Sequence, residues 1–220
     1  CAYVPINPKY PKERISDIVK QADIKVLVGS ESDWGEMRDK IHDIDGVKYV
    51  LFPEAREIFL EKPLIGVFES QLANFEILSV PLKTEANENV YIMFTSGSTG
   101  TPKGVQVTGM NVMALLTNMK QVYRLSPGFK ASQTFDLSFD LSVSDMFITW
   151  SNGGTLCVLP EHELSCPAEY IVREKIDFWH SVPTLANNLS RLGFLQPDSF
   201  PNLKFSVFAG EPFTLLGAAV

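Results

Sequence analysis

A short segment of this sequence, residues 95–104, combines the residue types that bind phosphate groups. It runs Thr-Ser-Gly-Ser-Thr-Gly-Thr-Pro-Lys-Gly, so hydroxyl donors alternate with glycines and a lysine follows a proline. Glycine lets backbone N–H groups approach an anion closely, and lysine supplies a point charge. The residues expected to bind phosphate are Thr95, Ser96, Gly97, Ser98, Thr99, Gly100 and Lys103.

Two other interpretations of this segment fit its spacing less well. A Walker P-loop requires the pattern GxxxxGK[ST] followed by a helix. Here Gly97 and Gly100 are too close together, and Lys103 is followed by Gly104 and a β-branched stretch. A flexible linker would need neither the Pro-Lys-Gly ending nor a hydrophobic stretch on each side.

The segment resembles the signature loop of the adenylate-forming superfamily, which includes amino-acid adenylation domains, acyl-CoA synthetases and luciferases. A second stretch, AYVPINPKYPKERI at 2–15, resembles the AYVPIDPxYPxERI segment of adenylation domains from nonribosomal peptide synthetases and stand-alone amino-acid ligases. That segment is mainly structural in the family, and Asn7 stands where aspartate is usual. The resemblance covers essentially the whole chain and implies that ATP and Mg²⁺ are used.

An aspartate that follows an expected strand at 130–134 is the candidate for selecting an amino acid. The pattern FDxS occurs twice, at 135–138 and 139–142. In the family that the sequence resembles, such an aspartate holds the substrate's α-ammonium group, and the pattern continues as FDxSxxxxF into a helix. Only the second copy has this register with Phe147, which implies Asp140 as the anchor. A carboxylate in a dry pocket needs such a cation.

Two less specific roles stand beside this one. Asp140 could simply be the N-cap of the helix that follows it. Asp136, in the first copy of the pattern, is expected to be a strand-end or turn residue.

The resemblance implies further site residues on the expected helices and strands. The residues implied to line the substrate pocket are Phe139, Asp140, Leu141, Ser144, His180, Val207 and Ala209. Gly210 and Glu211 are implied to lie beside adenine. A lone histidine is more often a core residue, and Ala-Gly-Glu is also a common strand-to-helix turn, so those alternatives stay open. No catalytic residue and no metal ligand is assigned within the chain.

The activity that the resemblance implies is amino-acid activation. The substrate carboxylate attacks the α-phosphorus of ATP, and aminoacyl-adenylate and pyrophosphate form. The acyl group then passes to the phosphopantetheine thiol of a carrier protein. Details at 138–143, 153–156 and 210–211 look like D-alanine:carrier-protein ligase, and a nonribosomal peptide synthetase domain is the other subfamily. An acyl- or aryl-CoA synthetase, which has no use for Asp140, and a catalytically inactive nucleotide-binding fragment are the alternatives.

Several elements of that family do not occur in the sequence. They are the aromatic-Gly-Pro-Thr-Glu segment, the ribose-binding aspartate, the hinge and the C-terminal domain with its catalytic lysine. We therefore expect residues 1–220 to be part of the large domain of an adenylation enzyme, with a weak seam near 81–90. By itself this part is expected not to turn over efficiently.

Composition and charge exclude several other classes of protein. Hydrophobic residues make up 45% of the 220 residues and charged residues 20%, a globular balance. The formal net charge of −7 does not provide the basic surface of a nucleic-acid binder. No apolar run approaches the ~20 residues that span a bilayer. The cysteines, Cys1, Cys157 and Cys166, lack CxxC spacing, which favours reduced thiols in a cytoplasmic protein.

The elements that must position these residues alternate along the chain. Short apolar stretches and segments of helical period predict an α/β fold with mostly parallel sheets flanked by helices on both faces. Helices are expected at 11–22, 34–44, 111–123 (with Asn111 as N-cap), 142–150, 167–175 and 183–192. Strands are expected at 24–28 (buried), 47–52, 76–80, 90–94, 105–108, 130–134, 155–159, 178–182 and 204–209. Ligands in such folds lie beyond the carboxyl ends of strands, here the loops 95–104, 135–142, 180–184 and 209–213.

Overall fold

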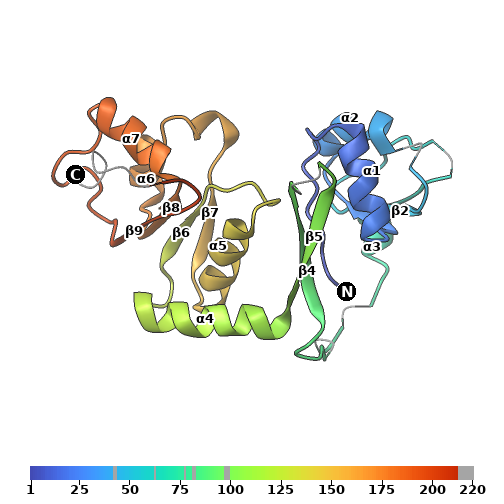
Figure 1. Cartoon of the computed structure of the whole chain (residues 1–220), viewed down its shortest axis with the longest axis horizontal. Coiled ribbons are helices and arrows are strands. Elements are labelled where there is room, and N and C mark those ends of the chain that lie inside the picture. The colour runs from blue at the N-terminus through green and yellow to red at the C-terminus, as the bar shows by residue number, and fades with distance from the viewer. Residues whose placement is uncertain (42–43, 62, 77, 81–82, 97–99, 213–220) are drawn as a thin grey trace. The chain divides into compact units, whose positions relative to one another are not determined.

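Helices and strands mostly alternate along the chain, with β2–β3 and β4–β5 as exceptions, in a computed structural model, which describes residues 1–220 except 42–43, 62, 77, 81–82, 97–99 and 213–220 (Figure 1). The helices are α1 Lys12–Gln21, α2 Glu31–Ile41, α3 Glu69–Leu72, α4 Gly109–Tyr123, α5 Asp140–Ser151, α6 Ala168–Glu174 and α7 Pro183–Arg191, with a 3₁₀ turn at Glu161–Glu163. The strands are β1 Val26–Val28, β2 Tyr49–Phe52, β3 Ile65–Phe68, β4 Asn89–Ser96, β5 Pro102–Thr108, β6 Lys130–Gln133, β7 Thr155–Val158, β8 Phe178–Ser181 and β9 Phe205–Phe208.

The chain divides into two compact units, Cys1–Met110 and Asn111–Val220. The first unit contains a parallel sheet of order β1-β2-β3 and an antiparallel pair β4-β5, and the second contains a parallel sheet of order β7-β6-β8-β9. The seam expected near 81–90 stays a prediction, and residues 81–82 lie outside the described residues.

The parallel sheet of the first unit packs one face against α1 and α2. Ile15 and Val19 lie on one side of α1 because helical residues four apart share a face, and they join Ile41, Val50 and Phe52 in the core. The opposite face of the sheet is exposed in the part of the chain that the structure describes. On it Val26 is 45% exposed, Val28 66%, Tyr49 40% and Ile65 52%. The expectation of a buried strand at 24–28 is therefore wrong about burial, although the strand itself is present.

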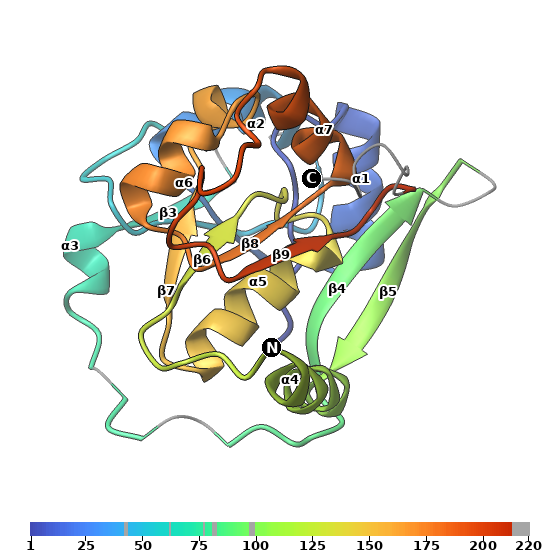
Figure 2. The same cartoon turned by 90° about the vertical axis from the view of Figure 1, so that its left-hand side faces the viewer.

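The strands β4 and β5 form a two-stranded hairpin, which stands out clearly in Figure 2. Its register pairs Thr95 with Lys103 and Ser96 with Pro102. The segment before α1 adds to this hairpin, because the N–H of Tyr3 donates to the carbonyl of Val90 at 3.0 Å. The beginning of the chain therefore supports the strand that leads into the glycine-rich loop.

The four-stranded sheet of the second unit carries helices on both faces. Phe178 packs with Ile148 of α5 on one face, whereas Trp179, the next residue of β8, packs with Ile171 of α6 and Leu185 of α7 on the other. Alternate residues of a strand point to opposite faces, so a strand buried on both sides is apolar throughout. Figure 1 shows α5 and the α6–α7 pair on different sides of this sheet. The predicted fold class is confirmed.

Most of the expected elements are present within a few residues of their predicted bounds, and three details differ. The described residues of 76–80 form no strand, whereas β3 was not expected. The helix α4 begins at Gly109, so Asn111 lies inside it and is not its N-cap. Within the part of the chain that the structure describes, no helix is both long and apolar enough to cross a membrane.

Candidate functional site

The predicted phosphate-binding residues lie on the phosphate hairpin, by which we mean β4, β5 and the residues between them. Thr95 and Ser96 are exposed at the end of β4, and Lys103 is exposed near the start of β5. Directly opposite residues of an antiparallel pair point to the same face, so Thr95 and Lys103 are neighbours. Gly97, Ser98 and Thr99 lie outside the described residues.

Gly100 needs the conformational freedom of glycine. Its φ is +82°, in the left-handed region that other residues adopt only at a cost. Among the described residues, no heavy atom lies within 4 Å of the position that a Cβ would take there. The backbone at this end of the hairpin is therefore both turned and accessible, as binding an anion through N–H groups requires.

Arg14 connects the early motif to the phosphate hairpin. Its Nη2 donates to the carbonyl of Phe94 at 3.5 Å, and its guanidinium carbon lies 4.5 Å from the centre of the Tyr10 ring. Phe94 directly precedes Thr95, so the guanidinium contacts β4 just before the loop. This contact gives a physical reason for the Tyr-Pro-Lys-Glu-Arg stretch, whose role was expected to be structural.

The second unit has a topological switch point between β6 and β8. The connection after β6 runs through α5 to β7, and the connection after β8 runs through α7 to β9, in the opposite direction and over the other face. Such an arrangement leaves a crevice beyond the carboxyl ends of the two strands, where open α/β sheets bind ligands.

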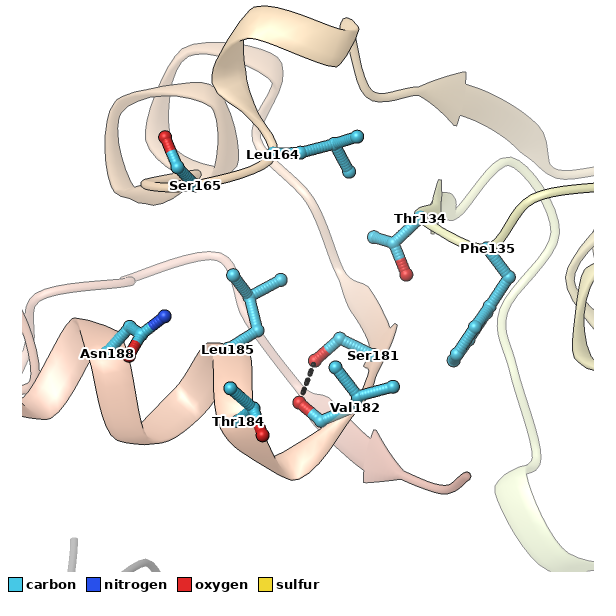
Figure 3. Close-up of a pocket in the computed structure, with 9 residues that line it drawn as sticks. All are labelled: Thr134, Phe135, Leu164, Ser165, Ser181, Val182, Thr184, Leu185 and Asn188. Atoms are coloured by element: carbon cyan, nitrogen blue, oxygen red, sulfur yellow. Dashed lines mark hydrogen bonds between the residues drawn. The ribbon is translucent and has the colours of Figure 1, made fainter. Parts of the chain in front are cut away.

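A cavity of about 190 Å³ lies at this position (Figure 3). Its lining residues come from the ends of β6 and β8, from α7 and from the turn before α6, and they are Thr134, Phe135, Leu164, Ser165, Ser181, Val182, Thr184, Leu185 and Asn188. Several of its hydroxyls are already engaged: Thr134 donates to the carbonyl of His180 at 2.6 Å, and Ser181 donates to that of Val182 at 3.3 Å. None of the predicted pocket residues is among these lining residues, although His180 directly precedes Ser181 in β8.

Asp140 is the first residue of α5, and Phe139 before it is the N-cap. The alternative that Asp140 is the N-cap is wrong. Its side chain is exposed among the described residues, so this unit alone does not provide the dry surroundings that favour pairing with an ammonium group. A carboxylate at a helix N-terminus is itself favourable. The neighbouring Asp136 accepts from the N–H of Ser138 at 2.8 Å, which confirms its turn role.

The other predicted pocket residues come from three adjacent elements. Leu141 and Ser144 lie on α5, and His180 on β8 pairs in register with Val207 on β9. A Cβ added at Gly210 would lie 3.5 Å from Cδ1 of Leu141. The structure thus brings Leu141 to the end of β9, where Ala209 and Gly210 follow the strand. Their role in binding a substrate stays a prediction.

Glu211, predicted to lie beside adenine, has a structural contact. Its Oε2 accepts from the backbone N–H of Thr184 at 3.1 Å and also from the Thr184 hydroxyl. Thr184 is in the first turn of α7, where backbone N–H groups lack helical partners. The carboxylate therefore ties the loop after β9 to the start of α7, and a role toward adenine stays a prediction.

His180 is held by a carboxylate that the sequence analysis did not single out. Its Nδ1 lies 2.6 Å from Oδ1 of Asp145 on α5, and the two residues are 4% and 2% exposed. Burial raises the pKa of the Asp145 carboxyl, and the hydrogen bond with His180 opposes that rise. The signal in the sequence was an acid in the middle of α5, between buried residues of that helix, because a buried acid requires a partner.

In the described parts of the chain, no group of three or more His, Cys, Asp or Glu side chains is placed to hold a metal ion. Magnesium keeps several waters and often binds largely through the phosphates of its nucleotide. The residues present therefore suit an ion that arrives on a nucleotide better than one held by the protein alone.

A glycine-rich hairpin in the first unit and a parallel sheet with a switch-point crevice in the second are each features of proteins that bind nucleotides. The AMP-binding enzyme family matches residues 1–215, and the chain belongs to that family.

Two curated relatives and one solved structure illustrate the similarity. The L-proline--[L-prolyl-carrier protein] ligase of Pseudomonas fluorescens is 27% identical over 214 residues, which cover 96% of this chain and 41% of the ligase. The D-alanine--D-alanyl carrier protein ligase of Listeria innocua is 30% identical over 215 residues, with 96% and 39% covered. The Vibrio cholerae adenylation domain AlmE, solved in complex with glycyl-adenosine-5'-phosphate, matches with a TM-score of 0.80 and 25% identity, covering 99% of this chain and 42% of that one. The chain thus spans about two fifths of the length of these relatives.

Proposed function

We propose that the protein activates an amino acid as its aminoacyl-adenylate and transfers it to a carrier protein. In the first step a carboxylate oxygen of the amino acid attacks the α-phosphorus of ATP. The bond to the bridging oxygen breaks, and pyrophosphate leaves. In the second step a phosphopantetheine thiol attacks the acyl carbon, and AMP leaves.

The phosphate hairpin carries the proposal. Exposed hydroxyls at Thr95 and Ser96, the left-handed backbone at Gly100 and the cation of Lys103 suit the β- and γ-phosphates of ATP. Phosphoryl-group chemistry of this kind needs positioning and charge stabilisation more than covalent help from the protein. Mg²⁺ would accompany the nucleotide and neutralise phosphate charge.

Selection of an amino acid over other carboxylic acids is assigned to Asp140. A fatty or aryl acid offers no cation to this carboxylate, whereas an amino acid offers its α-ammonium group. The two relatives named above act on proline and on D-alanine, each with a carrier protein, which supports an amino-acid substrate here.

The test is pyrophosphate exchange into ATP, measured on the protein at its full natural length with amino acids, fatty acids and aryl acids. Amino acids are expected to support exchange. Asp140→Ala should lower kcat/KM for the amino acid about tenfold or more, because it removes a charge-assisted hydrogen bond to the α-ammonium group, which contributes ~1.5–3 kcal/mol. Lys103→Ala should raise KM for ATP about tenfold or more, because a charge-assisted hydrogen bond contributes ~1.5–3 kcal/mol.

Lys120→Ala is the matched control, since Lys120 is an exposed lysine near the end of α4. It should leave both constants unchanged. Exchange with fatty or aryl acids alone would reject the amino-acid substrate, and an Asp140→Ala variant that activates the same amino acid equally well would reject the anchor.

A further inference from the structure

The outer edge of β4, which faces away from β5, is supported by the beginning of the chain. The N–H of Tyr3 donates to the carbonyl of Val90 at 3.0 Å, and the N–H of Ile92 donates to the carbonyl of Tyr3 at 3.0 Å. Alternate residues of a strand present their backbone groups on the same edge, so the next carbonyl on this edge belongs to Phe94. The edge therefore extends to the residue just before Thr95.

Arg14 supplies a donor at that next carbonyl. Its Nη2 lies 3.5 Å from the oxygen of Phe94, and its guanidinium carbon lies 4.5 Å from the centre of the Tyr10 ring. The planar group thus contacts both a carbonyl and an aromatic face, and all of these residues belong to the first compact unit. The side chain of Arg14 takes the place on this edge that the backbone of Tyr3 has two residues earlier in β4.

Packing alone does not explain a guanidinium at this position. Arg14 is half-buried, its Nε is buried without a hydrogen-bond partner, and no acid forms an ion pair with it among the described residues. A buried donor without a partner costs free energy, which an apolar side chain of similar length would avoid. Arg14 shares a face of α1 with Ile18, four residues further on, which is fully buried and apolar. The cation therefore lies, at a cost in stability, beside the segment expected to bind phosphate.

The backbone of Phe94 determines where the phosphate-binding groups of the hairpin lie. Thr95 follows it directly and pairs in register with Lys103. Phe94 itself pairs with Gly104, and its ring packs so closely there that an added Cβ would lie 3.0 Å from it. A displacement of Phe94 would therefore move both a hydroxyl donor and the cation of Lys103.

We propose that Arg14 is a positioning residue for nucleotide binding, which holds the carbonyl of Phe94 so that Thr95 and Lys103 face the phosphates of ATP. It acts through β4 and does not touch the nucleotide. The hydrogen bond to the carbonyl is charge-assisted, and stacking on Tyr10 restricts the planar group. Because this hydrogen bond is long, its effect is expected to be modest. The inference rests on the proposed function in taking the hairpin as the phosphate site.

The test is binding of a non-hydrolysable ATP analogue, with an imido bridge between the β- and γ-phosphates, to the full-length protein in the presence of Mg²⁺. Arg14→Met keeps a long flexible side chain but removes every donor. It should raise Kd for the analogue about fivefold, the size of one modest hydrogen bond. In pyrophosphate exchange, KM for ATP should rise in proportion, whereas KM for the amino acid should stay unchanged.

Arg38→Met is the matched control, because Arg38 is an exposed arginine of α2 that pairs with the neighbouring Asp39 at 2.9 Å. It should leave Kd for the analogue and both KM values unchanged. Equal effects of the two substitutions on Kd would overturn the proposal.

Amide hydrogen exchange separates positioning from a direct effect of the charge. In the absence of nucleotide, Arg14→Met should increase exchange in residues 90–96 about fivefold, because an edge that has lost a hydrogen bond opens more often. Arg38→Met should not. Weaker binding of the analogue with unchanged exchange would mean that the charge acts on the phosphates from a distance, and this result would also overturn the proposal.

Arg14→Lys covers the case in which Arg14→Met fails to fold. Lysine keeps the charge and a donor but lacks the planar group that stacks on Tyr10, so Kd for the analogue should rise about twofold or more. An affinity equal to that of the unaltered protein would refute the role of Arg14. Failure of the unaltered protein to bind the analogue would instead reject the proposed function itself.

Discussion

Replacing Gly100 by alanine tests the phosphate hairpin through its backbone alone. The φ of +82° places this residue in the left-handed region, and no described heavy atom lies near the added Cβ, so a steric clash does not contribute. Holding an L-residue in this region costs about 1–2 kcal/mol, and the lower entropy of the unfolded chain offsets about 0.4–1 kcal/mol of it. The expected net cost is about 1 kcal/mol.

That strain can change either the stability of the protein or its affinity for ATP. If the turn keeps its conformation, the free energy of unfolding falls by about 1 kcal/mol. If the turn relaxes instead, its N–H groups move away from their phosphate-binding positions, and KM for ATP rises about fivefold, the equivalent of 1 kcal/mol. Pyrophosphate exchange at varied ATP, together with urea unfolding of the same preparation, measures both quantities.

Gly193→Ala provides the matched control. Gly193 has a φ of +80° and also has no described heavy atom within 4 Å of a Cβ. It follows α7 and precedes β9, so it lies toward the amino ends of the parallel strands, whereas the switch-point crevice lies beyond their carboxyl ends. The substitution should carry the same backbone cost and leave KM for ATP unchanged. Equal changes in KM for ATP in the two variants, or no change in either quantity for Gly100→Ala, would refute the reasoning.

Two further predictions concern buried or paired groups of the second unit. Although burial alone would raise it, the pKa of Asp177 is lowered by the hydrogen bond from Lys204 and by the backbone N–H of Lys130. Its contribution to stability is therefore present above the unfolded pKa of 3.8 and is lost as the pH falls through the lower folded value. Asp177→Asn should reduce the free energy of unfolding by about 1 kcal/mol at pH 7, since Lys204 is largely exposed, and the difference should be smaller in denaturation curves at about pH 3, below the unfolded pKa. An equal difference at both pH values would contradict this. Burial raises the pKa of the Cys157 thiol, so at pH 8 Cys157→Ser should leave the number of rapidly reacting thiols unchanged in Ellman titrations and lower the number by one after unfolding; a lower count in the native protein would show that Cys157 is accessible.

Local patterns predicted most of the elements because their causes are local. The helix α7 starts at a proline, whose fixed φ suits the first helical turn, and its apolar residues recur at helical spacing. The hairpin around residues 95–104 was expected from a glycine-rich loop between two apolar stretches. The strand β3 was missed because it is short and contains Gly66. Its pairing with β2, the preceding strand, is a tertiary contact that the pattern within β3 does not reveal.

Burial was predicted less well than secondary structure. The β-branched residues of β1 favoured a strand covered on both faces, but Val28 is mostly exposed because only one face of its sheet is packed against helices in the described chain. What covers a strand is decided by elements elsewhere in the sequence, and a pattern within the strand carries no information about them.

By itself the sequence indicated the class of this protein, because its glycine-rich loop and its early Tyr-Pro-Lys-Glu-Arg stretch resemble segments of a known family, and that resemblance also implied the role of Asp140. Tertiary structure alone decided which of the acids is buried and what it contacts. Asp145 and His180 are separated by 35 residues and meet only because α5 packs on the sheet beside β8. A hydrogen bond between distant residues follows from packing geometry, which no local spacing encodes.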